Sequence, residues 1–403
     1  MPNNSKHKKK QQRRQQEAQK KSRAKQIETD KKNDEFLDTE LDEVSPLVID
    51  DDMTEFKNMP KVELHAHLSG SLSPETIKLI MESDETRAEE IMKKYKLEKP
   101  ENMTGVFDCF PVIHAILRKP EAIRIAIRQT IKEFEEDNCV YLELRTSPKE
   151  TDFMTYEDYL QVCIESFEAA KHEFPRIKTF LIVSLDRRMP FETAAHILGL
   201  IGEAQQRTNV IVGVELSGDP HLDGRRLLKL FVAARRFHGL GITIHLAEVL
   251  QNMADVEDYL NLRPDRIGHG TFLHTDPYTE YLTNKYKIPL GENLIQLHLI
   301  FLFFLEICLS SNVYSKTTTN YRNSHFNYWR KRGVPVFICT DDKGVIPGAT
   351  LTEEYYKAAI TFDLSTEELI GINQDALLNS FAYKYNVTDL TETFRKINNN
   401  VLD

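Results

Sequence analysis

Short runs of β-branched and other apolar residues alternate with longer amphipathic segments from Lys57 onward. Two of the longer segments, 120–137 and 224–238, place apolar residues three and four positions apart, the spacing of one helix face. The short runs predict strands at 62–68, 139–146, 178–186, 210–218, 241–248, 266–271, 307–312 and 334–342. Eight strands separated by helices suit one closed parallel barrel better than two small domains. We therefore predict an α/β fold, an eight-stranded parallel (β/α) TIM barrel.

Residues 1–55 differ from the rest of the chain in composition. Positions 1–32 hold 12 Lys or Arg and three acids, whereas positions 33–55 hold 10 acids and no base. Such a segment buries too little apolar surface to offset the entropy of ordering, so we expect a disordered charged tail before a barrel domain at 56–403. The stretch KHKKKQQRR could be a nuclear-import or RNA-binding patch, or simply part of a solvated tail.

Composition narrows the function classes. The chain of 403 residues has 52 Lys plus Arg against 62 Asp plus Glu, a net charge of −10, which disfavours a protein that coats nucleic acid. The start of the chain lacks the apolar core of a secretory signal, and the run 294–305 has too few apolar residues to span a bilayer. The five cysteines form no C-x-x-C pair and indicate reduced, mostly buried thiols. We expect a cytoplasmic or nuclear monomer without a membrane partner.

Polar residues fall where the predicted strands end. They are His65, His67, Asp186, Ser217, Gly218, His245, Glu248, His269, Asp341 and Asp342. The carboxyl ends of parallel barrel strands converge on one mouth, where the active sites of this fold are built. The pattern therefore predicts an enzyme whose site lies at that mouth.

His65 and His67 lie two residues apart on a predicted strand. Both imidazoles leave the same face and can reach one ion, although such a pair alone is more often ordinary strand or surface histidines. Further histidines and an aspartate pair end other strands. Three imidazole nitrogens and one carboxylate, with room for a water molecule, suit a zinc ion that supports hydrolysis. We therefore expect a zinc site.

Three carboxyl groups bear on the chemistry. Glu248 follows His245 by three residues, so it could lean over the ion as a proton donor, or it could be a surface carboxylate of the next helix. Asp341 and Asp342 cannot both face the metal from an extended backbone, so one should bind the ion and the other should contact substrate. Two neighbouring carboxylates repel each other and raise one pKa unless a cation lies beside them.

Five strings carry a resemblance to a known family. VELHAHLSGS, ELSGDP, HLAE, RIGHGT and CTDDKGV, in this order and spacing, resemble the adenosine and AMP deaminase family over about residues 56–390. The resemblance implies a TIM barrel of the metal-dependent hydrolase type. It also implies zinc-assisted hydrolytic removal of the amine at C6 of a purine.

The resemblance implies a role for each matching residue. The ligands of one zinc ion per chain would be His65, His67, His245 and Asp341. Glu248 would protonate the purine N1, and His269 would orient or deprotonate the attacking water. Asp342 would hydrogen-bond N7, and the Gly218 backbone would meet N3. Chemistry agrees, because C6 becomes a good electrophile only when N1 is protonated during the attack.

The substrate depends on the residues after the first two strands. Where free-adenosine deaminases of this family usually carry an acid for the ribose 5′-hydroxyl, this chain has Ser69, which can donate to a 5′-phosphate. The string RTSPKE looks like a phosphate cradle, although a solvated turn would have the same residues. Its candidate substrate-binding residues are Thr146, Ser147, Pro148 and Lys149.

These features resemble the adenosine deaminase-like branch, whose members deaminate N6-methyl-AMP and related nucleotides to IMP. The resemblance implies that His67, His114 and Asp186 also line the pocket, although His114 could equally be an ordinary histidine on a helix face. The expected substrate is therefore a purine 5′-monophosphate with an N6-alkylamine. Alternatives are a deaminase of the free nucleoside, another metal-dependent hydrolase of the same superfamily, and an inactive member that acts as a scaffold.

One departure from the family pattern precedes the seventh strand. Fifteen extra residues, 291–305, stand between Leu290 and Glu306. An insertion inside a barrel strand would leave backbone groups without partners. Either the string IFLFFLEICLSS itself serves as the strand, or the segment is a gene-model error.

Overall fold

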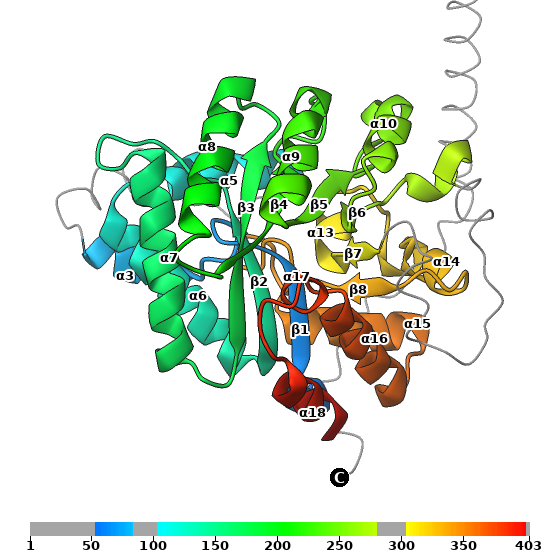
Figure 1. Cartoon of the computed structure of the whole chain (residues 1–403). Coiled ribbons are helices and arrows are strands. Elements are labelled where there is room, and N and C mark those ends of the chain that lie inside the picture. Colours follow the sequence, from blue (N-terminus) through cyan, green and yellow to red (C-terminus); the bar gives the residue numbers. More distant parts are fainter. Residues whose placement is uncertain (1–52, 84–102, 280–303, 400–403) are drawn as a thin grey trace, which may run out of the picture. The chain divides into compact units, whose positions relative to one another are not determined.

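The computed structural model describes residues 53–83, 103–279 and 304–399. Eight parallel strands pair in sequence order, and helices surround them (Figure 1). The ring is closed by a bridge between Ala66 and Asp341, where the Asp341 amide donates to the His65 carbonyl at 2.8 Å. The predicted TIM barrel is confirmed. The strands are β1 Lys61–His67, β2 Cys139–Thr146, β3 Lys178–Asp186, β4 Ile211–Ser217, β5 Gly241–Leu246, β6 Arg266–His269, β7 Leu305–Ile307 and β8 Val336–Ile338.

The helices between and after the strands cover the outside of the barrel. The α-helices are α2 Thr54–Asn58, α3 Pro74–Glu82, α5 Met103–Ile116, α6 Pro120–Glu136, α7 Tyr156–Glu173, α8 Phe191–Ala204, α9 Leu228–His238, α10 Val256–Asn261, α13 Leu309–Tyr314, α14 Phe326–Arg330, α15 Leu351–Phe362, α16 Thr366–Leu378, α17 Phe381–Lys384 and α18 Thr391–Asn399. Short 3₁₀ turns are η1 Arg225–Leu227, η2 Leu250–Asp255, η3 Leu273–Thr275 and η4 Tyr321–Asn323.

The two predicted amphipathic segments form helices for the reasons that their sequences give. In α6, Pro120 supplies a preset first turn, and the apolar face from Ile123 to Phe134 is buried. The segment 224–238 forms η1 and then α9. Gly239 ends α9 in the left-handed conformation, with φ of 62°.

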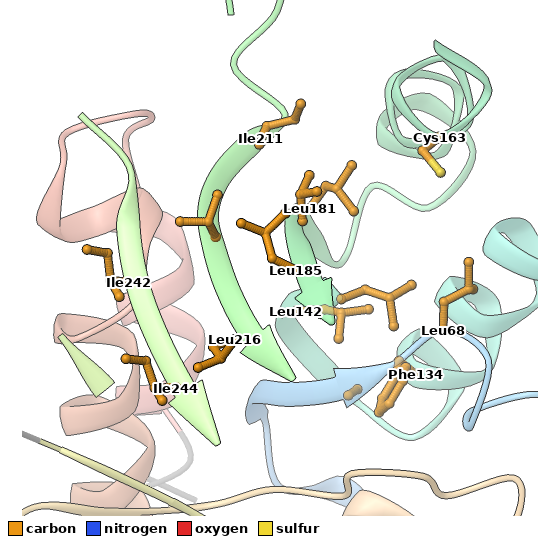
Figure 2. Packing of buried hydrophobic residues seen from close by; sticks show 14 of the residues in the cluster. Leu68, Phe134, Leu142, Cys163, Leu181, Leu185, Ile211, Leu216, Ile242 and Ile244 are labelled. Carbon is orange, nitrogen blue, oxygen red and sulfur yellow. The ribbon is translucent and has the colours of Figure 1, made fainter. Parts of the chain in front are cut away.

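The strands separate an apolar outer face from a polar interior. Leu142, Leu181, Leu216 and Ile244 belong to the core between strands and helices, and Figure 2 shows Leu216 and Ile244 side by side on the neighbouring strands β4 and β5. Full burial of each such side chain stabilises the fold by about 1.5–3 kcal/mol. Alternate positions of several strands carry charged side chains such as Glu215, which is fully buried inside the barrel. The larger hydrophobic core therefore lies between the strands and the helices, and the mouth is left for chemistry.

Phe381 closes the amino-terminal end of the barrel. Its ring lies so close to β4 and β5 that a Cβ on Gly213 or Gly241 would come within 2.3 Å of it. The Arg266 guanidinium stacks 3.7 Å above the same ring, which favours a cation–π contact. This packed floor leaves the carboxyl-terminal mouth as the open end.

The predicted strands are too long in the second half of the barrel. The run 307–312 was expected to be a strand, but β7 is only Leu305–Ile307 and helix α13 begins at Leu309. The strands predicted at 266–271 and 334–342 shorten to β6 and β8. Apolar runs do not distinguish a buried strand from the loop or helix that continues it.

Two expectations lie mainly outside the described residues. Residues 1–52 of the charged tail and 291–303 of the apolar segment are outside them, whereas Thr54 already begins α2. Phe304 and Leu305, the last residues of the apolar segment, are buried, and Leu305 is the first residue of β7.

Two smaller expectations can be compared with the described part of the chain. Within it, Cys139, Cys163, Cys308 and Cys339 are buried free thiols, as the sequence indicated. None of its helices combines the length and apolar character needed to cross a bilayer.

Candidate metal centre and active site

Three histidines meet at the carboxyl-terminal mouth of the barrel. β1 supplies His65 and His67 from alternate positions, and β5 supplies His245. The Nε2 atom of His245 lies 3.1 Å from that of His65 and 3.3 Å from that of His67. His65 and His245 are buried, and His67 is partly buried.

Asp341 completes this cluster from the loop after β8. Its Oδ1 atom lies 3.6 Å from Nε2 of His65 and 3.5 Å from Nε2 of His67. Its backbone has a left-handed φ of 63°, which Asp tolerates better than most residues. The four donor atoms lie within 4.8 Å of one another. Ligands at about 2.0–2.2 Å from a tetrahedral ion would lie roughly 3.3–3.6 Å apart, so the spacing fits one ion of zinc's size.

The electrostatics of the cluster also favour a cation. Burial and Arg145 oppose the charged form of His65, but Asp341 and Glu306 together raise its pKa to about 9. By contrast, burial lowers the pKa of His67 to about 3. The surroundings thus stabilise a positive charge among the Nε2 atoms. A divalent ion would take the place of the proton on His65.

Two buried carboxylates hold the far nitrogens of these imidazoles. Nδ1 of His65 lies 2.7 Å from Oε2 of Glu306, and Nδ1 of His245 lies 3.0 Å from Oε1 of Glu215. Such contacts keep the proton on Nδ1 and turn the Nε2 lone pair toward the ion. Arg145 donates to both carboxylates, at 3.0 Å to Glu306. Although burial opposes ionisation, Arg145 holds the pKa of both carboxyl groups well below the usual range.

Glu248 and His269 flank the cluster. His269 ends β6 with a left-handed φ of 60°, and its Nε2 atom lies 3.6 Å from Oδ2 of Asp341. Oε1 of Glu248 lies 3.9 Å from the same Nε2 atom, and the Glu248 side chain is mostly buried. Burial lowers the pKa of His269, so its imidazole is neutral and able to accept a proton.

Asp342 projects into the same mouth beside the loop after β1. A Cβ on Gly70 would lie 1.6 Å from Oδ1 of Asp342, so only glycine leaves room for this carboxyl group. Burial and the neighbouring Asp341 raise the pKa of Asp342, as expected for adjacent carboxylates. Within the described residues, its buried Oδ1 atom has no hydrogen-bond partner. This buried oxygen therefore lies beside Gly70 without a polar partner.

A second group of predicted residues gathers after β2 and β3. Burial lowers the pKa of Lys149 to about 7, with opposing influence from Asp186. Burial, Lys149 and Arg188 lower the pKa of His114 to about 3, so these groups are electrostatic neighbours. A Cβ on Gly218, whose φ is 95°, would lie 2.6 Å from Oδ1 of Asp186.

The remaining candidates for the phosphate cradle have fewer contacts that define their positions. The Leu68 amide donates to the Arg145 carbonyl at 2.8 Å, so the loops that carry Ser69 and Thr146 leave adjacent strands side by side. The Thr146 hydroxyl lies 2.8 Å from the Tyr159 hydroxyl, which already engages it. Ser147 is partly exposed, and Pro148 is buried.

Comparison with known proteins identifies the group to which this chain belongs. The profile of the family described as adenosine deaminase matches residues 60–397. The chain belongs to the adenosine deaminase family. As a member, it is 96% identical over 403 residues to the adenosine deaminase-like protein of Caenorhabditis elegans, and the match covers 100% of both chains.

Two further adenosine deaminase relatives extend the comparison. The chain is 35% identical over 356 residues to the N6-methyl-AMP deaminase of Danio rerio, which covers 86% of this chain and 97% of the relative. A solved structure described as the ADAL–IMP complex aligns with a TM-score of 0.71 at 27% identity. That alignment covers 85% of this chain and 98% of the other.

Membership in the adenosine deaminase family defines the reaction class. The chain is a hydrolytic deaminase, so the prediction of an enzyme is confirmed. The family is metal-dependent, and the cluster of three histidines and one aspartate fits a divalent metal ion.

Sequence reasoning missed the residues that support this deaminase site. They are Arg145, Glu215 and Glu306 below the histidines, Ser311 and Asn312 beside Asp341 and His269, and Arg188 beside Asp186. One signal was present for the first three. A charged residue at the centre of an apolar strand must face the barrel interior, since the outer face packs against helices. No comparable signal marked the other three.

Proposed function

We propose that this chain is a zinc-dependent deaminase of N6-substituted purine nucleoside 5′-monophosphates. In its reaction, N6-methyl-AMP and water yield IMP and methylamine. The proposal goes beyond family membership in two respects, the metal and the nucleotide substrate. Relatives named N6-methyl-AMP deaminase and a solved ADAL complex with IMP support the substrate.

Ser69 is the observation that carries the nucleotide assignment. It follows β1 at the mouth of the barrel, beside the loop that bears Lys149. A hydroxyl can donate to a phosphate oxygen, and an ammonium group adds a charge-assisted bond. An acid at position 69 would instead repel a 5′-phosphate. The lowered pKa of Lys149 supports the same assignment, because a phosphate dianion would restore the charge that burial disfavours.

The four clustered donors would hold the ion. His65, His67 and His245 would each offer Nε2, and Asp341 would offer Oδ1. A zinc ion at such a site would supply Lewis acidity that lowers the pKa of a water molecule to about 7. The carboxylates behind His65 and His245 would keep these imidazoles aimed at the ion.

Glu248 and His269 would then transfer protons to the purine and from the water molecule, respectively. Glu248 would protonate N1, which makes C6 electrophilic, and His269 would accept a proton from the attacking water. A C6–O bond forms, the C6–N bond breaks, and the departing amine takes up a proton. Asp342, whose buried Oδ1 atom has no partner among the described residues, would hydrogen-bond N7, and the Gly218 backbone would meet N3.

The pocket groups would determine substrate choice. Thr146, Ser147 and Lys149 would surround the phosphate. His114, which is neutral, would lie along the nucleotide together with Asp186. Asp186 lies next to Gly218.

We also propose a domain organisation that fits this activity. Residues 56–403 would form the deaminase domain, with 1–55 as a separate charged tail. The family profile, which matches residues 60–397, supports the extent of the domain.

A parallel assay tests the proposed function. Zinc-loaded protein is incubated with N6-methyl-AMP, AMP, adenosine and N6-methyladenosine, and the products are separated by liquid chromatography. The proposal predicts that N6-methyl-AMP has the highest kcat/KM. A preference for either nucleoside would instead favour a nucleoside deaminase, and zinc binding without turnover of any substrate would favour an inactive scaffold.

A further inference from the structure

Helix α13 lies between the catalytic cluster and the outer helix α15. Figure 1 labels α13 and α15. It starts two residues after β7, where the chain leaves the barrel. Three consecutive polar residues, Ser310, Ser311 and Asn312, occupy its first turn, and all three are buried. Buried polar groups need hydrogen-bond partners, so the partners of these side chains show which parts of the protein hold the helix in place.

Ser311 and Asn312 face the active site. The Ser311 hydroxyl donates to Oδ2 of Asp341 at 2.7 Å, which leaves Oδ1 to face the histidines. The Asn312 amide donates to the Thr271 hydroxyl at 3.0 Å and lies 3.5 Å from Nδ1 of His269. Two adjacent residues of one helical turn thus contact His269 at the end of β6 and Asp341 beyond the end of β8.

Ser310, one residue earlier, is held from the opposite side by α15. Its amide lies 3.2 Å from each carboxylate oxygen of Glu354, and its hydroxyl accepts from Nζ of Lys357 at 2.8 Å. Lys357 is also anchored by the Gly348 carbonyl. Glu354 and Lys357 lie one turn apart on α15 and form an ion pair. Glu354 binds the backbone of Ser310, and Lys357 binds its side chain.

This pair is a poor source of stability. Glu354 is fully buried and its nearest contact with Lys357 is 3.8 Å. Burial raises the pKa of Glu354 to about 7. The loss of solvation therefore destabilises the ionised carboxylate more than Lys357 and Ser310 stabilise it. Buried ion pairs often add little or nothing to stability relative to apolar residues. The geometry around Ser310 offers a different role.

We propose that Glu354 and Lys357 are positioning residues for the deamination, which act through Ser310 and the first turn of α13 on Asp341 and His269. The inference rests on the proposed role of Asp341 as a metal ligand. In this arrangement, Glu354 fixes where the turn begins, Ser311 selects the oxygen of Asp341 that faces the ion, and Asn312 orients the imidazole of His269.

The first test is Glu354→Gln, which keeps the shape but replaces one acceptor oxygen with an amide donor opposite the Ser310 amide. We expect metal affinity, measured by competition with a chromogenic chelator, to fall roughly 10-fold. We expect kcat for N6-methyl-AMP to fall by a similar factor with KM unchanged, since no substrate contact is altered.

A matched control separates positioning from general stability. Asp265 is another buried carboxylate paired with a lysine, Lys384, but it lies at the amino end of β6, far along the strand from the mouth. Asp265→Asn should lower the melting temperature without changing metal affinity. If Glu354→Gln behaves like this control, with only a lower melting temperature, the inference is wrong.

A double-mutant cycle tests the route through Ser311. The loss of metal affinity from Glu354→Gln should be much smaller in a Ser311→Ala background, because both changes act on the same contact. Full additivity would contradict the route. Should Glu354→Gln fail to fold, Ser310→Ala removes the hydroxyl that Lys357 holds and is measured in the same way. Unchanged metal affinity and kcat in Ser310→Ala would then overturn the inference.

Failure of the proposed function would be visible separately. The unaltered protein would then bind no metal at this site or would not turn over N6-methyl-AMP. Chelator competition needs no substrate, so the positioning role can be judged even if the true substrate differs.

Discussion

The two halves of the barrel mouth place their functional residues by different means. Strands β1–β5 have six to nine residues each, whereas β6, β7 and β8 have four, three and three. In the long-strand half, His65, His67 and His245 lie within regular strands. In the short-strand half, His269 and Asp341 have left-handed backbones at or beyond the strand ends.

This difference shows what holds each side chain in place. The strands orient the three histidines by their pleat, and carboxylates inside the barrel contact the rings of His65 and His245. The short-strand half has few ladder bonds at the mouth, so side-chain contacts replace them. Ser311 and Asn312 contact Asp341 and His269, and Nε2 of His325 lies 2.7 Å from the His269 carbonyl. The long-strand half therefore places its histidines by strand geometry, whereas Asp341 and His269 in the short-strand half are supported by contacts from outside the ring.

The largest effect is expected where the two halves meet, between Glu248 and His269. Glu248→Gln removes the proton donor for N1 without touching a proposed metal ligand. It should lower kcat by roughly 10² to 10⁴, the usual range for a lost general acid, with metal content unchanged. Steady-state kinetics and elemental analysis check both. The matched control is Glu257→Gln on the exposed side of α10, which should change neither. Loss of metal in Glu248→Gln would make Glu248 a ligand.

The second-largest effect is expected from substitution of the carboxylates behind the histidines. Glu215 lies on long strand β4 and Glu306 on short strand β7, yet each holds one imidazole. Substitution of either by Gln should weaken metal binding by about 10- to 100-fold. Glu306→Gln should lie at the upper end, because Arg145 and Arg266 both lose a charged partner there. Chelator competition measures both, and wild-type affinity in either variant would contradict the assigned orientation of that imidazole.

Ser69→Asp probes the substrate side of the long-strand half. The new carboxylate should raise KM for N6-methyl-AMP by about 10-fold, equivalent to about 1.4 kcal/mol of repulsion of the phosphate. KM for N6-methyladenosine should change little, since that molecule has no phosphate. The matched control is Ser69→Asn, which adds bulk without charge. Equal effects of Ser69→Asp on nucleotide and nucleoside would remove the phosphate assignment.

The smallest expected effect is a pH dependence of nucleotide binding. The pKa of Lys149 is about 7 without ligand, and a bound phosphate dianion should raise it. The attraction is therefore complete below pH 7 and is lost as the pH rises. Affinity for IMP should fall roughly fivefold between pH 7 and 9, for a pKa that binding raises by about one unit. Affinity for inosine should stay level.

Calorimetry at several pH values measures the affinities for IMP and for inosine. Lys149→Gln should abolish the difference between their pH profiles. A fall in IMP affinity that persists in this variant would assign the titration to another group.

Sequence reasoning succeeded where the pattern is periodic. The strands β1–β5 and helix α6 were predicted almost to the residue, because alternation and helical spacing act over many positions. Strand ends and family motifs predicted that His65, His67, His245 and Asp341 would meet at the mouth of the barrel. The structure brings these four together.

Reasoning from sequence failed where tertiary contacts decide. The string ICLSSN reads as a strand, but Glu354, 44 residues after Ser310, accepts from the Ser310 amide and supports a helix there. The support from Ser311 and Asn312 depends on that helix and could not be inferred. Glu215 and Glu306 carried a signal, since acids within apolar strands must face an interior. Their pairing with particular imidazoles needed coordinates.

Zinc titration of metal-free protein tests the central claim most directly. Activity toward N6-methyl-AMP is followed while zinc is added in steps to a known concentration of chain. The account predicts no turnover at the start, a linear rise, and a plateau at one ion per chain. Full activity in the metal-free protein, or a rise that continues to two ions, would contradict a single ion held by three histidines and one aspartate.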